Sequence, residues 1–284
     1  METVRLDGKA LAAKKRESIR EGVEKFTAKS GFAPGLAVII VGDNPASHSY
    51  VRGKEKACEK AGILSEKQHL SADVSEKELL DMIGHYNEAP HIHGILVQLP
   101  LPDHISESKV IEQISADKDV DGFHPISVGR MVTGQKTLLP CTPAGIMEIL
   151  KAYDITLSGK NAVVLGRSNI VGKPMAQLLL NEHATVTVCH SRTPNMKDLA
   201  KSADIVISAI GKPGLVDDTY IKEGAVVIDV GISRLEDGTL TGDVDEAAVQ
   251  GQAGHLTPVP GGVGPMTITM LLANTLQAAE EQTA

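Results

Sequence analysis

Five short runs of consecutive apolar residues in the second half of the chain constrain the fold more than any other feature. Strands that are buried on both faces of a parallel sheet have such continuous apolar runs. The helical or loop segments that separate these runs have the lengths found between the strands of Rossmann domains. The pattern predicts a parallel sheet covered by helices. The runs are NAVVLG at 161–166, ATVTVC at 184–189, DIVISAI at 204–210, AVVIDVG at 225–231 and GHLTPV at 254–259.

The first half of the chain also alternates helices with strands, which predicts a second α/β unit. Its predicted segments are a helix over 8–30 ended by Gly31, a strand over 35–42, a helix over 46–61 ended by Gly62, a helix over 75–88 that opens on the capping pattern Ser75 to Glu78, and a strand over 94–100. A last helix, over 265–282, is long enough to return to this first unit. We therefore expect an α/β protein with an N-terminal domain of residues 1–140 plus 266–284 and a Rossmann-type domain of residues 141–265.

Charge and composition exclude several classes of partner. The net charge is -8 and the 28 Lys and Arg are scattered, so we expect no nucleic-acid partner. No run reaches about 18 apolar residues and the first residues lack a signal-peptide pattern, so we expect no membrane association and a cytoplasmic location. Cys58, Cys141 and Cys189 are widely spaced, which favours free thiols. Burial as small apolar residues is a more common role for them than reactivity.

A glycine-rich turn follows the strand at 161–165 and leads into a helix. It runs from Gly166, Arg167 and Ser168 to Gly172. Glycine lets the backbone approach a pyrophosphate closely, and the N-terminus of a helix presents free N–H groups to it. The pattern G-x-S-x-x-x-G is weak alone, and its place between strand and helix makes it a candidate dinucleotide site. The alternative is an ordinary turn of an α/β domain.

The next strand ends at His190, Ser191 and Arg192, where an NAD site usually carries Asp or Glu. A carboxylate would repel a 2'-phosphate. Ser191 and Arg192 instead offer a hydroxyl group and a permanent cation, and Arg167 can reach the same region. The residues therefore favour NADP. If Arg192 is only a surface charge, the choice between NADP and NAD stays open.

Candidate catalytic groups lie in the first half. Tyr50 and Lys54 are four residues apart on a predicted helix and so share one face, although this spacing is common on surface helices. Gln98 lies at the carboxyl edge of a predicted strand, where open α/β sheets bind ligands. A loop rich in proline and glycine, residues 257–267, could hold main-chain groups against a ligand or could be a tight turn.

The sequence contains two patterns that resemble metal sites. Residues 117–122 read D-x-D-x-D-G, as in a calcium loop, but the position that needs a bidentate Glu is Val128. His91 and His93 lack a nearby third ligand. We assign no metal, and at least one of the three aspartates requires another explanation.

Six motifs together resemble the bifunctional methylenetetrahydrofolate dehydrogenase/cyclohydrolase family over essentially the whole chain. They are Tyr50–Lys54, Val97–Pro102, Asp119–Gly122, Pro140–Pro143, Gly166–Ser168 and Pro258–Pro265. The resemblance implies an N-terminal folate-binding catalytic domain, an NADP-binding Rossmann domain, a last helix that returns to the first domain, and a homodimer.

The family oxidises 5,10-methylenetetrahydrofolate with NADP and hydrolyses the methenyl product to 10-formyltetrahydrofolate, in the one-carbon metabolism that supplies purine biosynthesis. By resemblance, Tyr50 stacks on the folate, Lys54 is the key group for hydrolysis with help from Gln98, and Asp121 bonds the pterin ring. The other implied substrate contacts are Val97, Leu99, Pro260, Gly261, Gly262, Val263 and Gly264. The implied cofactor contacts are Gly166, Arg167, Ser168, Ser191 and Ile232, to which the charge argument adds Arg192.

Two other functions are compatible with parts of this pattern. A monofunctional dehydrogenase of this fold would have lost the hydrolytic step, and the presence of Lys54 argues against it. A cofactor-sensing protein without catalysis would keep the glycine turn but would have no reason to keep Tyr50, Lys54, Gln98 and Asp121 together.

Overall fold

A computed structural model describes residues 2–284, which divide into two units that we describe separately. The six-stranded unit contains the residues up to Ala13 and Thr142–Thr267. The three-stranded unit contains Lys14–Cys141 and Ile268–Ala284. Helices α1 (Gly8–Ser30) and α10 (Val263–Gln282) each begin in the six-stranded unit and end in the three-stranded unit.

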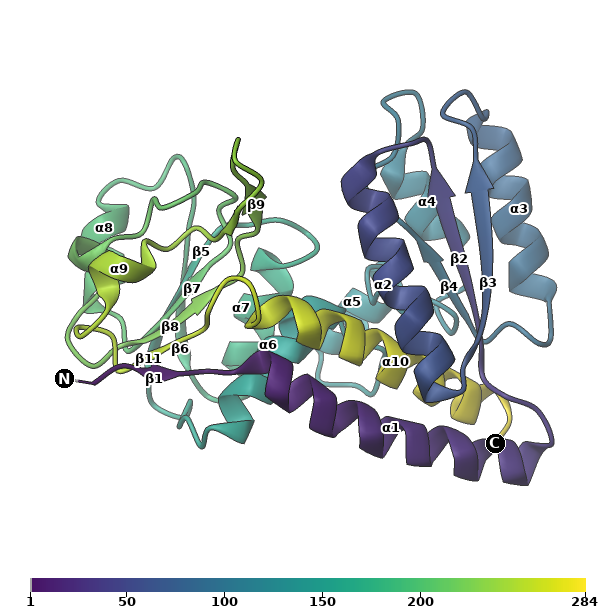
Figure 1. Cartoon of the computed structure of the whole chain (residues 1–284), viewed down its shortest axis with the longest axis horizontal. Coiled ribbons are helices and arrows are strands. Elements are labelled where there is room, and N and C mark those ends of the chain that lie inside the picture. The colour runs from purple at the N-terminus through teal and green to yellow at the C-terminus, as the bar shows by residue number, and fades with distance from the viewer. Residues whose placement is uncertain (1) are drawn as a thin grey trace. The chain divides into compact units, whose positions relative to one another are not determined.

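The sheet of the six-stranded unit is parallel throughout and has the order β1-β11-β8-β7-β5-β6 (Figure 1). Its strands are β1 (Val4–Arg5), β5 (Asn161–Leu165), β6 (Thr185–Cys189), β7 (Ile205–Ser208), β8 (Val226–Asp229) and β11 (His255–Leu256). The chain enters the Rossmann part of the sheet at β5, adds β6 on one side and then β7 on the other. The order of strands therefore reverses beside β5, where doubly wound sheets bind their ligands.

Helices and a hairpin complete this unit. They are α6 (Cys141–Ala152), α7 (Gly172–Asn181), α8 (Met196–Ser202), the 3-10 helix η1 (Asp218–Tyr220), the hairpin β9 (Ser233–Arg234) and β10 (Leu240–Thr241), and α9 (Glu246–Val249). Side chains alternate across the sheet. Val163 and Leu165 of β5 pack in one buried cluster with Ala200 of α8. That cluster forms the core on one face of the sheet.

The sheet of the three-stranded unit is also parallel, with the order β3-β2-β4. Its strands are β2 (Gly35–Val41), β3 (Leu64–Leu70) and β4 (Gly94–Val97), and its helices are α2 (Pro45–Ala61), α3 (Glu76–Glu88), α4 (Glu107–Gln113) and α5 (Pro125–Val132). The central strand β2 is buried on both faces. Leu36, Val38 and Ile40 pack with α2, whereas its alternate residues pack with α3 and α4, so these helices cover opposite faces (Figure 1).

The structure confirms the predicted α/β fold, and the helix signals that the sequence carries are visible in it. Gly62 ends α2 in the left-handed conformation with φ 77°, and Ser75 forms the expected capping box with Glu78. Strand β3 was not predicted. Its sequence LSEKQHL is polar because β3 is an edge strand with exposed and half-exposed positions only. Strand β4 ends at Val97, so Gln98 follows the strand.

Strand β1 adds the first residues of the chain to the sheet of the six-stranded unit, a pairing that the sequence gives no sign of. The Val4 amide donates to the Gly254 carbonyl at 2.9 Å and the Leu6 amide donates to Leu256 at 2.8 Å. A strand of two residues is too short to produce a periodic pattern, so only the tertiary pairing reveals it. In the part of the chain that the structure describes, no helix is long and apolar enough to cross a membrane.

Candidate active site

Lys54 and Gln98 form a hydrogen-bonded pair in the three-stranded unit. Lys54 lies on α2 with only 8% of its surface exposed, and its Nζ donates to Gln98 Oε1 at 3.0 Å. The Gln98 amide nitrogen Nε2 donates to the Leu99 carbonyl at 2.8 Å. The Gln98 main-chain N–H donates to the Ile39 carbonyl at 2.8 Å and so continues the pairing of β4 with β2. Both ends of the Gln98 side chain are therefore held, and the amide oxygen faces the lysine.

Asp121 is the third member of this cluster. Burial raises the pKa of its carboxyl group to about 6, with the Lys54 ammonium opposing the shift and the Asp119 carboxylate adding to it. Tyr50 lies one turn before Lys54 on α2 and is 38% exposed, and partial burial raises the pKa of its phenol. The structure thus places an aromatic ring, an amine, an amide and a carboxyl group in one unit.

The segment from Asp117 to Gly122 is held by its own buried groups, which explains the calcium-like pattern. Asp119 is 2% exposed and accepts a hydrogen bond from the main-chain N–H of His124 at 2.7 Å. Lys118 Nζ donates to two carbonyl groups at the end of α3. At Gly122, with φ +74°, a Cβ would lie 2.5 Å from the carbonyl carbon of Leu139. Asp119 is therefore structural, which leaves Asp121 as the candidate for binding a ligand.

Asn274 supports the same turn and was missed by the sequence analysis. Its Nδ2 donates to the carbonyl groups of Val120 and Leu139, both at 2.8 Å. A buried polar residue in an apolar helix such as α10 was the available signal.

The Val97 side chain is buried at 5% exposure in the core under α3 and α4, so a ligand contact of Val97 would use its main chain.

The glycine turn after β5 has the tight geometry that its sequence suggested. Gly166 has φ +124°, and a Cβ there would lie 2.3 Å from the Ala209 carbonyl oxygen. Ser168 Oγ accepts hydrogen bonds from the main-chain N–H groups of Val171 at 3.2 Å and Gly172 at 3.3 Å. Ser168 therefore stabilises the start of α7. Arg167 is exposed.

The turn after β6 presents exposed Ser191 and Arg192 at the same edge of the sheet as the glycine turn. His190 shapes this turn: its N–H donates to Thr193 Oγ1 at 2.9 Å, and its Nδ1 accepts from the Arg192 N–H at 3.2 Å. Ile232 follows β8 and is 48% exposed. These residues fit a dinucleotide that carries a 2'-phosphate, because the turn offers a cation and contains no carboxylate.

Two buried aspartates organise the loops at the carboxyl ends of β7 and β8, and the sequence analysis did not identify them. Asp243, fully buried, accepts hydrogen bonds from the main-chain N–H groups of residues 210–212 at 2.7–3.1 Å. Asp229 accepts from the N–H groups of residues 231, 243 and 244, each at 2.9 Å. An aspartate that ends an apolar strand, as Asp229 does, was the available signal.

The loop of Pro260–Gly264 lies in the six-stranded unit, where it leads into α10. Gly261 has φ +110°, and its carbonyl oxygen accepts from the Lys9 N–H at 2.8 Å. A Cβ on Gly8 would lie 1.9 Å from the Gly262 carbonyl oxygen. The start of α1 therefore packs directly on this loop and holds its main chain in place.

The remaining candidates have structural roles. All three cysteines are free and buried, and burial raises the pKa of the Cys58 thiol to about 12, which fits the expected role of small apolar residues. His91 and His93 have separate partners. His91 Nε2 lies 2.9 Å from Glu66 Oε1, and buried His93 accepts the Gly35 N–H on Nδ1 at 2.9 Å.

A parallel sheet with a tight glycine turn at its switch point, followed by a strand end that carries no acidic residue, defines a dinucleotide-binding protein of the Rossmann class. Family comparison is more specific. Residues 6–121 match the tetrahydrofolate dehydrogenase/cyclohydrolase catalytic domain, and residues 140–283 match the NAD(P)-binding domain of the same family. The chain belongs to the tetrahydrofolate dehydrogenase/cyclohydrolase family.

Individual relatives agree with this assignment. The chain is 62% identical to the bifunctional protein FolD of Halalkalibacterium halodurans, over 99% of this chain and 100% of that protein. The crystal structure of the FolD enzyme of Campylobacter jejuni superposes with a TM-score of 0.96 at 51% identity, covering 98% of this chain and 99% of that one. The FolD of Trypanosoma brucei, solved with NADP cofactor and inhibitor, gives a TM-score of 0.96 at 40% identity and covers 100% of this chain and 99% of that one.

Proposed function

We propose that this protein oxidises 5,10-methylenetetrahydrofolate to the 5,10-methenyl cation with NADP and then hydrolyses the cation to 10-formyltetrahydrofolate. Membership of a dehydrogenase/cyclohydrolase family supports both activities. The observation in the structure that carries the proposal is the partly buried, hydrogen-bonded pair of Lys54 and Gln98 beside Asp121, because binding a dinucleotide alone requires none of these three groups.

The oxidation transfers a hydride from the methylene carbon and leaves a cation that is stabilised by the flanking nitrogens. NADP, when bound, supplies the hydride acceptor. The chain then has to hold two carbons close together and aligned. We assign the stacking of the folate to Tyr50, which is 38% exposed and whose phenol pKa is raised by partial burial. We assign the anchoring of the pterin ring to the Asp121 carboxylate.

The hydrolysis adds water to the methenyl carbon, releases one proton, and breaks one carbon–nitrogen bond. We assign the proton transfer to Lys54. Gln98 Oε1 holds one N–H of its Nζ at 3.0 Å, which orients the amine and leaves its other positions for water. Gln98 is thus a positioning residue for Lys54. A monofunctional dehydrogenase would have no use for this pair.

For the cofactor we propose contacts from Gly166, Arg167, Ser168, Ser191, Arg192 and Ile232. The close approach of Gly166 to Ala209 explains why a side chain is not tolerated there. Exposed Arg192 beside Ser191 favours NADP over NAD.

From the family resemblance we further propose that Val97, Leu99 and Pro260–Gly264 contact the folate. We propose on the same ground that residues 1–140 with 266–284 act as the catalytic domain and 141–265 as the NADP domain, that the chain forms a homodimer, and that it works in the cytoplasm.

The proposal is tested by mixing the purified protein with methylenetetrahydrofolate and either NADP or NAD while NADPH (or NADH) and methenyl-folate absorbance are followed together. We expect NADPH to rise while the methenyl species stays low, because the second step consumes it. Accumulation of the methenyl species would identify a dehydrogenase alone. Absence of signal with both cofactors would contradict the folate assignment and favour a cofactor-sensing protein.

A further inference from the structure

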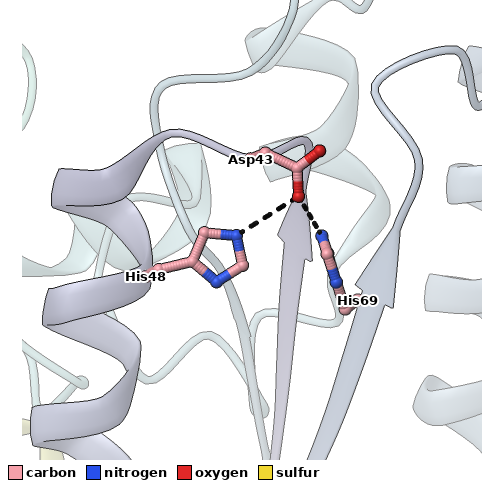
Figure 2. A group of neighbouring side chains, drawn as sticks. All are labelled: Asp43, His48 and His69. Carbon is pink, nitrogen blue, oxygen red and sulfur yellow. Dashed lines mark ion pairs between the residues drawn. The ribbon is translucent and has the colours of Figure 1, made fainter.

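Asp43, His48 and His69 form a cluster at the carboxyl edge of the three-stranded sheet (Figure 2). Asp43 follows the end of β2, His48 lies in the first turn of α2, and His69 is the last residue but one of β3. Because β2 and β3 are parallel neighbours, both strands deliver these residues to the same edge. His69 lies on β3, on one side of β2. Strand β4, which Gln98 follows, lies on the other side of β2.

The donor atoms of this cluster lie close together. The Nε2 atoms of His69 and His48 lie 3.3 and 3.7 Å from Asp43 Oδ1, and each lies 3.2 Å from the carbonyl oxygen of Gly42. The imidazole rings are nearly perpendicular, at 89° with centroids 4.9 Å apart, so both rings direct an edge toward the carboxylate without stacking (Figure 2). The side-chain donor atoms all lie within 4.8 Å of one another.

The four separations of 3.2–3.7 Å are close to those within the shell of a small divalent ion. Four ligands placed tetrahedrally at about 2.0–2.1 Å from zinc lie roughly 3.3–3.4 Å from one another. We propose that Asp43 Oδ1, His48 Nε2 and His69 Nε2, with the Gly42 carbonyl oxygen as fourth donor, bind a divalent transition-metal ion of the zinc type. Two imidazoles with one carboxylate suit such an ion better than Mg²⁺ or Ca²⁺, which prefer all-oxygen shells.

The protonation of the cluster is compatible with binding. Each Nε2 lies 3.2 Å from the Gly42 carbonyl oxygen, a distance at which a tautomer protonated on Nε2 donates to it. A neutral imidazole can instead carry its proton on Nδ1, and the Nε2 lone pair is then available to a metal. The Asp43 side chain is 86% exposed and that of His69 43%, so an ion can enter from solvent. None of its residues is among those proposed to bind folate or NADP, although His48 lies on α2 together with Tyr50 and Lys54.

The experiment is calorimetric titration of the untagged, metal-free full-length protein with ZnCl2. Three single variants each remove one ligand: His48→Gln, His69→Gln and Asp43→Asn. The matched control is His91→Gln, because His91 is also an exposed histidine at the surface of this unit and faces one carboxylate, that of Glu66. Circular dichroism and dehydrogenase activity establish that each variant is folded.

We expect one zinc ion per chain for the parent and for His91→Gln, and binding at least about tenfold weaker in each ligand variant. X-ray absorption of the parent with one equivalent of zinc should show two imidazole ligands at about 2.0–2.1 Å. The proposal is overturned if the parent binds no zinc, if His48→Gln and His69→Gln bind it as the parent does, or if the absorption spectrum shows sulfur ligands or fewer than two imidazoles.

Discussion

At the scale of single residues, a substitution of Lys54 can distinguish the two proposed activities, because we assign Lys54 a role in hydrolysis only. Its Nζ contacts Gln98 Oε1, and in the proposed mechanism hydride transfer involves neither group directly. We expect Lys54→Met to lower cyclohydrolase activity at least about 100-fold, as for the loss of a group that transfers a proton. Dehydrogenase activity should persist and fall by less than about tenfold, since the folate site is otherwise intact. Separate assays of the two steps measure this ratio.

The control for Lys54→Met is Lys56→Met, because Lys56 is exposed on the same helix. It should leave both activities close to those of the parent. Equal loss of the two activities in Lys54→Met would contradict the assignment of proton transfer to Lys54. It would indicate that the residue serves mainly to shape the folate site.

Asp121 gives the enzyme an expected pH dependence. Because burial raises the pKa of its carboxyl group to about 6, the group is charged above that pH and neutral below it. A carboxylate accepts hydrogen bonds from the N–H groups of a pterin on both oxygens, and the protonated acid loses part of this capacity. We expect kcat/KM for methylenetetrahydrofolate to fall as the pH drops through about 6.

The Asp121→Asn variant tests the origin of this pH dependence. An amide does not titrate, so kcat/KM of the variant should be low and should lack the acidic limb. If the parent and Asp121→Asn show the same limb in stopped-flow or steady-state profiles, another group is responsible for it.

At the scale of elements, the turn between β5 and α7 depends on Gly166. Alanine at this position would combine an unfavourable φ of +124° with a Cβ 2.3 Å from the Ala209 carbonyl oxygen. Gly159 is the matched control, because it has φ +74° but a Cβ added to it would meet no atom within 4 Å. We expect Gly159→Ala to lower the free energy of unfolding by about 1–2 kcal/mol.

Gly166→Ala should cost clearly more stability than Gly159→Ala and should also weaken NADP binding, because the turn has to open to admit the methyl group. Urea unfolding and fluorescence titration with NADPH measure the two effects. Equal stability of the two variants with unchanged NADPH affinity would show that the close contact at Gly166 is easily relieved.

The loop after β7 depends in the same way on Asp243. Its two carboxylate oxygens accept from the N–H groups of residues 210–212, and asparagine would turn an NH2 group toward at least one of these donors. We expect Asp243→Asn to lower the free energy of unfolding by about 1–3 kcal/mol, the cost of a buried donor left without a partner.

Asp245→Asn is the control for Asp243→Asn. Asp245 caps α9 by accepting the Ala248 N–H, and asparagine is about as good a cap as aspartate. Urea unfolding should therefore show little change in that variant. A comparably small change in Asp243→Asn would mean that the loop rearranges around the new amide.

At the scale of the whole molecule, the homodimer is a prediction that follows from the family resemblance. We expect sedimentation equilibrium over a range of concentrations to give twice the mass of one chain. A mass of one chain at every concentration would contradict it. Because the dimer is inferred from the family resemblance alone, an active monomer would leave the proposed chemistry of Lys54, Gln98 and Asp121 unaffected.

The sequence by itself determined the α/β class and most helix ends. It did so because these features are local. Apolar runs record burial on both faces of a strand, and Gly62 and Ser75 cap helices through contacts within a few residues. The pairing of Lys54 with Gln98 was anticipated only through the family resemblance, since spacing along the chain does not report a hydrogen bond between a helix and a strand end.

Only the tertiary structure decided which distant residues meet. Strand β1 is two residues long and exists because β11 offers it an edge, and β3 is polar because it lies at an edge of its sheet. The carboxylates of Asp229 and Asp243 and the amide of Asn274 became recognisable as supports once their main-chain donors and acceptors were placed. Asp43, His48 and His69 converge for the same physical reason: parallel strands bring residues far apart in sequence to one edge, where the donor atoms of these three lie within 4.8 Å of one another.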